Sequence, residues 1–343
     1  MRFFRRIIAL FGLGLSAGNL AADESRESLA VGGQAVMEGI MMRNGSRLAL
    51  AVRKPDGVIV VSSLPWLEMF KSGFFKRKFL RGFPILLETM VNGIKALNTS
   101  ATIAIEGQDE EIKPWHLVMT LIVALTLAFA LFVVGPHLIT IALGALKLVG
   151  GVETLSFHVW DGLIKFAMFI GYIAIISRLP DIKRVFQYHG AEHKTISAYE
   201  HGEDPVTVDN AAKYSRLHPR CGTTFLLFVL SISIILHAIL VPLLLYVWRP
   251  EVAIVKHAVV LIFKLLLMIP ISALAYETIR VTARLENRVV GALLRGPGLL
   301  LQYMTTREPD KQQLEVALVA LSEALGDDAH YAITIPEFIR LEN

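Results

Sequence analysis

Two histidines and a glutamate within five residues form the strongest chemical signal in this sequence. His189 and His193 are four positions apart, and Glu192 directly precedes the second histidine. On a helix, this spacing places both imidazoles on one face, where one helix can supply two nitrogen ligands to a tetrahedral zinc ion. The order His-x-x-Glu-His is that of the inverted zincins, whose glutamate polarises the metal-bound water. The pattern predicts a metal site with Glu192 as general base.

The same string has a plainer interpretation, because five-residue matches arise by chance. Buried histidines can simply be satisfied by backbone carbonyls or by Glu192. The surrounding residues favour the metal site, since the helical pattern from Pro180 to Glu200 has its apolar stripe on the face that carries both histidines. Asp181 is expected to cap the start of this helix, and Gly202 to end it. Both imidazoles are therefore expected to point inward.

A second polar cluster could complete the site. His218, Arg220 and Cys221 precede an apolar segment, at the same boundary as the two histidines. Cys221 near a helix N-terminus and beside Arg220 is expected to have a lowered thiol pKa, which suits a metal ligand or a nucleophile. Alternatively, it is a small buried residue at a helix start. The third ligand is expected to be His218 or Cys221, with Glu38 as an outside alternative.

Glu200 lies on the histidine stripe but beyond the reach of the same ion. It is seven residues after His193, which is about 10 Å along a continuous helix. We expect it to support the ligands or to contact the substrate. His201 lies off the stripe and is expected to face solvent.

The composition is that of a membrane protein. Of the 343 residues, 54% are hydrophobic and only 19% are charged, and the mean hydropathy is well above zero. A single cysteine excludes an intramolecular disulfide framework and a zinc cluster built from several cysteines of one chain. The net charge of +4 is small, and its basic residues flank apolar segments, so no nucleic-acid partner is expected.

Four segments are long and apolar enough to cross about 30 Å of hydrocarbon. They are roughly 115–136, 156–178, 223–247 and 252–276. The segment 179–220 contains six basic residues against one in 137–155, so the positive-inside rule places it, the site and both termini in the cytoplasm.

The remaining segments differ in character. The apolar stretch 137–150 is too short to span and follows Gly135-Pro136, so we expect a kinked extension or an interfacial helix. An N-terminal signal peptide is the alternative to an interfacial helix, but exporting the N-terminus would reverse the loop charges. Residues 31–63 predict an antiparallel β-meander, with turns at Asn44-Gly45 and Lys54 to Gly57.

From Trp66 to about Ile105 the pattern predicts helices. Within them, Phe74 to Phe79 mixes basic and aromatic residues, as in a membrane-surface segment or an amphipathic helix packed on the domain. Gln312 to Leu325 predicts one further amphipathic helix. The predicted organisation is an N-terminal interfacial helix or extension (1–29), a cytosolic meander with amphipathic helices (30–113), transmembrane helices one and two (114–178), the site-bearing cytosolic loop (179–222), transmembrane helices three and four (223–276) and a cytosolic helical tail (277–343).

Several ionisable residues fall inside the apolar segments. Asp161 and Lys165 are four positions apart and are expected to pair, while Lys264 and His237 lie near the middle of their spans. Such residues are functional candidates by default, here for transport, although Lys264 has the alternative of snorkelling to the membrane surface.

Longer motifs resemble a known family. Gly32 to Arg43, Tyr188 to Lys194, His218 to Thr223 and Pro297 to Asp310 are similar to the YqhQ-like family, bacterial membrane proteins classed as predicted metal-dependent enzymes. The resemblance covers about residues 30–325 and implies location in the bacterial cytoplasmic membrane. Motif positions implied in this way are Glu38, Arg43, His189, Glu192, His193, Lys194, Glu200, His218, Arg220 and Cys221.

The predicted protein is mainly α-helical and polytopic, with about four transmembrane helices, the small N-terminal meander and cytosolic helices. We expect a metal-dependent hydrolase with zinc as cofactor, acting at the cytoplasmic membrane boundary. The expected metal ligands are His189, His193 and His218 or Cys221, the expected catalytic residues are Glu192, Cys221 and Lys194, and the expected supporting or substrate-contacting residues are Glu38, Arg43, Glu200 and Arg220. The alternatives are a membrane scaffold or assembly factor for other membrane proteins and, third, a transporter.

Overall fold

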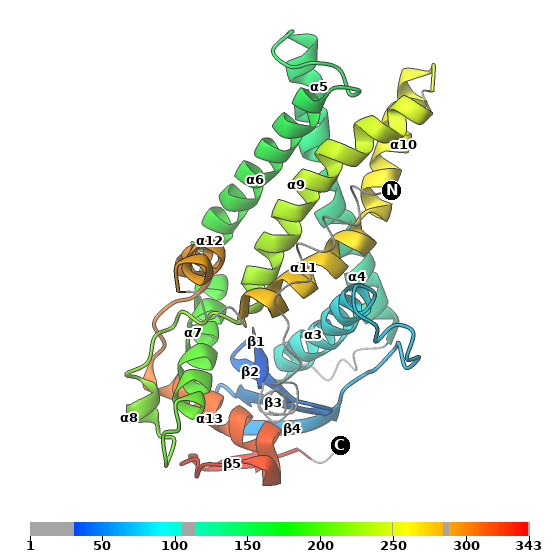
Figure 1. Ribbon diagram of the computed structural model, residues 1–343. Coiled ribbons are helices and arrows are strands. Elements are labelled where there is room, and N and C mark those ends of the chain that lie inside the picture. The colour runs from blue at the N-terminus through cyan, green and yellow to red at the C-terminus, as the bar shows by residue number, and fades with distance from the viewer. Residues whose placement is uncertain (1–30, 105–113, 249, 284–287, 342–343) are drawn as a thin grey trace.

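The computed structural model describes residues 31–104, 114–248, 250–283 and 288–341. An elongated helical bundle stands on a smaller unit built around a β-sheet (Figure 1). The predicted N-terminal helix or signal peptide lies outside the described residues.

Among the residues that the structure describes, four helical stretches are long and apolar enough to cross a membrane. They are Val118–Ala145, Leu155–Ile176, Gly222–Val247 and Ala253–Thr282. The first consists of α4 (Pro114–Phe129), a π-helical turn η1 (Ala130–Val134) and α5 (Gly135–Ala145), the second and third are α6 (Leu155–Ile176) and α9 (Gly222–Val247), and the fourth joins α10 (Ala253–Leu266) to α11 (Met268–Ala283). The mainly helical class and the four apolar segments are as predicted.

The first stretch does not break at Gly135-Pro136. The π-helical turn precedes this pair, and α5 continues the helix to Ala145. A π-turn changes the local backbone pairing, so that the missing N–H of proline is tolerated within a continuous helix. The interpretation of 137–150 as an extension of the first span therefore holds as far as Ala145.

The N-terminal meander is confirmed. Strands β1 (Gly32–Val36), β2 (Gly39–Asn44), β3 (Arg47–Arg53) and β4 (Ile59–Pro65) pair antiparallel in sequence order. Gly45 and Gly57 have φ values of 57° and 90° in the turns that the sequence predicted. A fifth strand, β5 (Phe338–Arg340), pairs parallel with β4 from the C-terminal end of the chain and was not predicted.

Both faces of the sheet are buried. Ile40, Met42 and Ala51 point toward helices α7 (Pro180–Glu200) and α13 (Lys311–Leu325), while Met41, Leu50 and Val52 belong to a core that includes Ala96 of α3 (Gly82–Ala104). These near-continuous apolar runs are typical of strands covered on both sides. The sheet therefore forms the middle layer between α3 and the pair α7 and α13.

Helix α13 is the centre of this unit. Asp310 caps it in a capping box with Gln313. Leu318, Val319 and Leu321 are at most 1% exposed, so the predicted amphipathic helix is in fact buried nearly all round. We expect Leu318→Ala to lower the free energy of unfolding by about 2–5 kcal/mol, measured by denaturation in detergent, while Leu341→Ala at an exposed position leaves it nearly unchanged.

The helices predicted from Trp66 onward are only partly present. Helix α3 begins at Gly82, and residues 66–81 form turns and irregular backbone. Backbone N–H groups of Met69 and Phe70 bond to the Glu88 carboxylate instead of to a preceding helical turn. Phe79 has a φ of 64°, which no right-handed helix contains. Hydrogen bonds to carboxylates from other parts of the chain therefore replace the helix that the pattern of this segment predicts.

Candidate metal centre

Helix α7 carries the predicted motif into the most buried part of the sheet unit. It begins with Pro180 in its first turn after the cap residue Leu179, so Asp181 lies within the first turn and is not the cap. Proline at that position needs no hydrogen-bond partner for its nitrogen, which favours this start. From residue 190 to residue 199 every residue is buried. The two histidine rings lie on one face, with centroids 4.4 Å apart.

Backbone carbonyls orient both imidazoles. Nδ1 of His189 lies 2.8 Å from the carbonyl oxygen of Thr305, and Nδ1 of His193 lies 2.6 Å from that of Arg216. Because a carbonyl only accepts, Nδ1 is the donor in both rings, which leaves the lone pair of a neutral imidazole on Nε2. Ligating histidines in metalloproteins are oriented through the opposite ring nitrogen in the same way.

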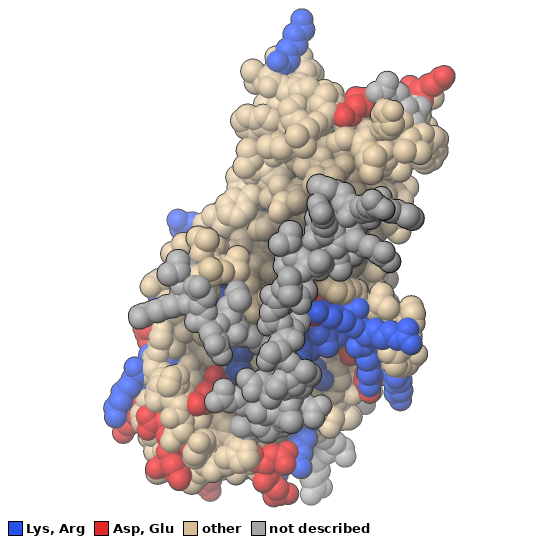
Figure 2. Space-filling model, viewed as in Figure 1, with Lys and Arg blue, Asp and Glu red and all other residues tan. Residues whose placement is uncertain are grey.

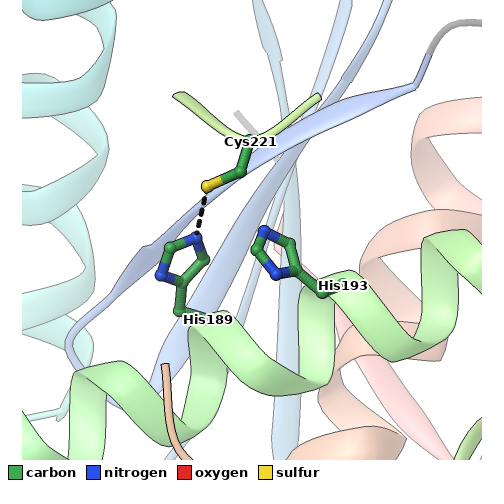
Figure 3. Close-up of side chains that lie close together, drawn as sticks. All are labelled: His189, His193 and Cys221. Carbon is green, nitrogen blue, oxygen red and sulfur yellow. Dashed lines mark hydrogen bonds between the residues drawn. The ribbon is translucent and has the colours of Figure 1, made fainter. Parts of the chain in front are cut away.

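Cys221 completes a close group of three. Its Sγ lies 3.2 Å from Nε2 of His189, and one ligand atom from each of Cys221, His189 and His193 lies within 4.8 Å of the others (Figure 3). Cys221 caps α9 and accepts the N–H of Thr223. The structure therefore brings together two histidines of α7 and the cap residue that directly precedes the third apolar stretch.

The expected lowering of the Cys221 thiol pKa is wrong. Burial raises the pKa of the Cys221 thiol, and hydrogen bonds from the Thr223 hydroxyl and from backbone N–H groups of the α9 N-terminus only partly oppose it. Cys221 is only 7% exposed, so the loss of hydration outweighs the helix end.

Two buried polar atoms of the motif have no hydrogen-bond partner within the described residues. They are Nε2 of His193 and Oε2 of Glu192. Such atoms are rare, because an unsatisfied buried polar group costs free energy. Burial lowers the pKa of His193 to about 2, so this imidazole is neutral near pH 7. Its free lone pair therefore lies beside Sγ and Nε2 of the other two residues, where an additional group could bind.

Glu192 lies against the sheet. Its carboxyl accepts a hydrogen bond from the backbone N–H of Gly33 in β1, and burial raises its pKa to about 7. A side chain at Gly33 would put its Cβ 2.8 Å from the Glu192 carboxyl carbon, so glycine is required for this approach. Sequence reasoning assigned no role to Gly33, because nothing local indicates which distant side chain it faces.

His218 and Glu200 belong to an adjacent polar group. Nε2 of His218 lies 3.4 Å from a carboxylate oxygen of Glu200, which also forms an ion pair with Arg220. Gln302 of α12 (Arg288–Thr305) holds the His218 backbone, donating to its carbonyl and accepting its N–H. Burial lowers the pKa of His218 to about 4. The His218 ring lies 5.6 Å from that of His193, but its Nε2 faces Glu200 and its Nδ1 accepts the backbone N–H of Arg220 at 3.4 Å.

Three other predicted site residues contact partners outside the group of three. Glu38 accepts from Tyr188 and pairs with Arg184, and Arg43 stacks on Trp66 at 3.6 Å. The Lys194 ammonium donates to the carbonyls of Ala212 and Tyr214 at 2.9 and 2.8 Å and pairs with Glu308 at 3.0 Å. The structure does not bring Glu38, Arg43 or Lys194 to the group of three.

A separate polar group lies inside the bundle. Nζ of Lys264 is 2.9 Å from Asp161. Lys264 is fully buried, so its side chain does not snorkel. The predicted pair between Asp161 and Lys165 is also present, at 3.8 Å. His237 lies 3.4 Å from Lys165, and His137 lies 3.8 Å from Asp161. One carboxylate is therefore shared by two lysines in the apolar part of the chain.

Comparison with known proteins identifies relatives without an assigned chemistry. A family described as "Protein of unknown function (DUF1385)" matches residues 78–327. The chain is 33% identical over 315 residues to "Uncharacterized protein YqhQ" of Bacillus subtilis (strain 168), covering 88% of this chain and 93% of that protein. No solved structure matches the chain. Neither description names a metal or a reaction, so any chemistry must be argued from the geometry of the site.

Proposed function

The chain belongs to the DUF1385 family of proteins of unknown function. We propose that it is a membrane protein that binds a divalent metal ion, and that this ion is zinc. The proposed ligands are Nε2 of His189, Nε2 of His193 and Sγ of Cys221. The observation that carries the proposal is the buried Nε2 of His193, which has no hydrogen-bond partner among the described residues. Within those residues, His193 belongs to the only group of three His, Cys, Asp or Glu side chains close enough together to hold a metal ion.

The donor set suits zinc. Two imidazole nitrogens and one thiolate are ligands of the borderline-soft type that zinc prefers, and three protein ligands leave a fourth position for water or substrate, as in catalytic zinc sites. The carbonyls of Thr305 and Arg216 hold both rings with Nε2 directed inward. The buried Cys221 thiol would lose its proton on binding.

The hydrolase proposal depends on Glu192. When bound, zinc supplies a Lewis acid that polarises a carbonyl or phosphoryl oxygen and acidifies water. The Glu192 carboxyl has a free oxygen, and its pKa near 7 suits proton transfer at neutral pH. We propose that Oε2 of Glu192 accepts the proton of the attacking water, and that Arg220 and Glu200 contact the substrate. The positive-inside rule puts this site at the cytoplasmic membrane boundary.

A structural metal ion is the second candidate. The ligands come from α7 in the sheet unit and from the start of α9 in the bundle, so one ion would fasten the two parts together. This arrangement favours a scaffold or assembly factor for membrane proteins. Removing the metal would then lower stability without abolishing a reaction.

Metal analysis tests the proposal. We expect the detergent-purified protein, loaded with zinc and dialysed, to hold about one zinc per chain, and His189→Ala, His193→Ala and Cys221→Ser to hold almost none. His201→Ala is the matched control, because His201 is exposed at the end of the same helix and bonds only to Ser197 in the described contacts. A folded wild type that stays free of metal, or an unchanged zinc content in His193→Ala, would refute the site.

Glu192→Gln separates the two roles of an ion. Because Glu192 is not a proposed ligand, this variant should keep its zinc, checked by the same elemental analysis. Under the hydrolase proposal it should fail to restore the phenotype of a strain lacking the gene, since removing a general base costs about 10²–10⁴ in rate. Full restoration by a zinc-containing Glu192→Gln protein would favour the structural ion.

A further inference from the structure

The connection between β4 and α3 exposes ten consecutive residues, most of them basic or aromatic. We call residues 71–80 the basic aromatic loop. Every residue of this loop is exposed, and it contains four basic residues and no acidic one. The side chains of Phe74 and Phe79 are each 53% exposed and that of Leu80 is 41% exposed. The rings of Phe74 and Phe75 contact each other with centroids 5.5 Å apart, and large apolar side chains that are exposed together mark interaction sites.

The loop backbone is fixed at both ends, so the exposed rings do not result from a loose segment. Before the loop, the N–H groups of Met69 and Phe70 donate to the buried Glu88 of α3 at 2.9 and 3.0 Å. At its end, the N–H of Phe79 donates to the buried Glu277 of α11 at 3.3 Å. Arg81 adds two hydrogen bonds to Glu277, at 2.8 and 3.0 Å.

The backbone of Phe79 is strained. Its φ of 64° lies in the left-handed region, which is unfavourable for a bulky residue other than glycine. Strain of this kind persists where the surrounding contacts impose it, and it is concentrated at functional positions. Here the contact with Glu277 holds a phenylalanine on the outside of the molecule.

The loop lies at the level where an apolar span ends. Glu277, its anchor, is five residues before the end of the stretch Ala253–Thr282. The connection between β4 and α3 runs along the side of the molecule at the foot of the bundle (Figure 1). On this side, Lys and Arg side chains gather directly below the uncharged surface of the bundle (Figure 2).

We propose that the basic aromatic loop binds the headgroup layer of an anionic lipid membrane, with the rings of Phe74 and Phe79 in the interface and the cationic side chains against lipid phosphates. Cation and ring already lie together, since Arg77 is 5.8 Å from the Phe74 ring and Lys78 is 5.4 Å from the Phe79 ring. Aromatic rings favour the interfacial region, and clustered basic residues favour anionic lipid. Continuity with the apolar spans selects a bilayer over a protein partner.

Depth-dependent fluorescence quenching tests the insertion of the loop. The full-length protein is reconstituted in nanodiscs of plain or brominated phosphatidylcholine with phosphatidylglycerol, and the emission added by Phe74→Trp is obtained by subtracting the wild type. Bromine should roughly halve this added emission. Ile339→Trp on β5, at a similarly exposed position, should not be quenched. Unquenched emission from Phe74→Trp, and from Phe75→Trp as a second reporter, would overturn the proposal.

Removal of charge tests the recognition of anionic lipid. Raising the phosphatidylglycerol fraction should shift the Phe74→Trp emission to the blue, and Arg77→Gln with Lys78→Gln should remove that shift. Lys311→Gln with Arg340→Gln removes the same charge from exposed positions on α13 and β5 and should leave the shift intact. Quenching that is indifferent to phosphatidylglycerol would overturn the headgroup assignment.

Discussion

Replacing Asp161 with asparagine should lower the free energy of unfolding by about 3–5 kcal/mol, or prevent the protein from accumulating in a folded form. Asp161 is 1% exposed, and its two nearest cationic partners, Lys264 and Lys165, are also buried. The substitution would leave both ammonium groups in an apolar environment without a carboxylate. An uncompensated buried charge is among the most destabilising features of a folded protein.

An exposed ion pair provides the matched control for Asp161. Asp209 pairs with Lys311 at 2.9 Å, the same distance as between Asp161 and Lys264, but both partners are highly exposed. Asp209→Asn should therefore change stability by no more than about 1 kcal/mol. Lys264→Met supplies the second comparison, because it leaves one lysine for one carboxylate. It should be tolerated better than Asp161→Asn in thermal unfolding measured in detergent, and the reverse order would contradict our account of this group.

The elements that the sequence predicts well have a regular period or a clear turn. The turns at Gly45 and Gly57 between short apolar runs indicated the meander, and the long apolar runs indicated the spans. The short strand Phe338–Arg340 has no such signal, because it is defined by its pairing with β4 far away in the chain. Residues 66–81 carry a helical pattern, but Glu88 and Glu277 take up their backbone donors.

The residues of the candidate site also differ in how well the sequence predicts them. Helical spacing alone placed His189 and His193 together, because both belong to one element. The choice between His218 and Cys221 depends on the path of the intervening loop, where Gln302 of a distant helix fixes the His218 backbone. No local pattern contains that information. The sequence therefore predicts the half of the site that one helix supplies and leaves the other half open.

The polar group inside the bundle shows a further limit of single-sequence reasoning. The spacing of Asp161 and Lys165 indicated a pair on one helix turn, and the structure has that contact. Lys264 comes from another helix and is nearer to the carboxylate, at 2.9 Å. The snorkelling expected for an isolated lysine was an alternative only because its partner was unknown. Helix packing decides which buried charges meet.

Glu192 should make the metal-free protein less stable as the pH rises. The pKa of this carboxyl rises from 4.5 to about 7 on folding because of burial. The folded state thus holds the proton more tightly, so the favourable contribution is present at low pH and is lost as the pH rises from 4.5 to 7. Above pH 7 the full effect is about 3 kcal/mol of lost stability.

Glu192→Gln should remove this pH dependence. Between pH 5 and pH 8, the unfolding free energy of the metal-free wild type should fall by up to about 3 kcal/mol relative to the variant, measured by denaturation in detergent. Glu337→Gln, at an exposed position, is the control and should follow the wild type. Equal pH profiles for the wild type and Glu192→Gln would show that the buried carboxyl is not the titrating group.

Zinc should reverse the effect of Glu192 on stability. A bound dication beside the carboxylate favours its ionised form, so the zinc-loaded wild type should lose little or no stability between pH 5 and pH 8. The variant Cys221→Ser, which we expect not to retain zinc, should keep the pH dependence of the metal-free protein even when zinc is added. The buried Glu192 carboxyl would then destabilise the metal-free fold, and zinc would remove this destabilisation. Stability alone would favour a neutral residue at position 192, so a glutamate there is expected in a site maintained for function.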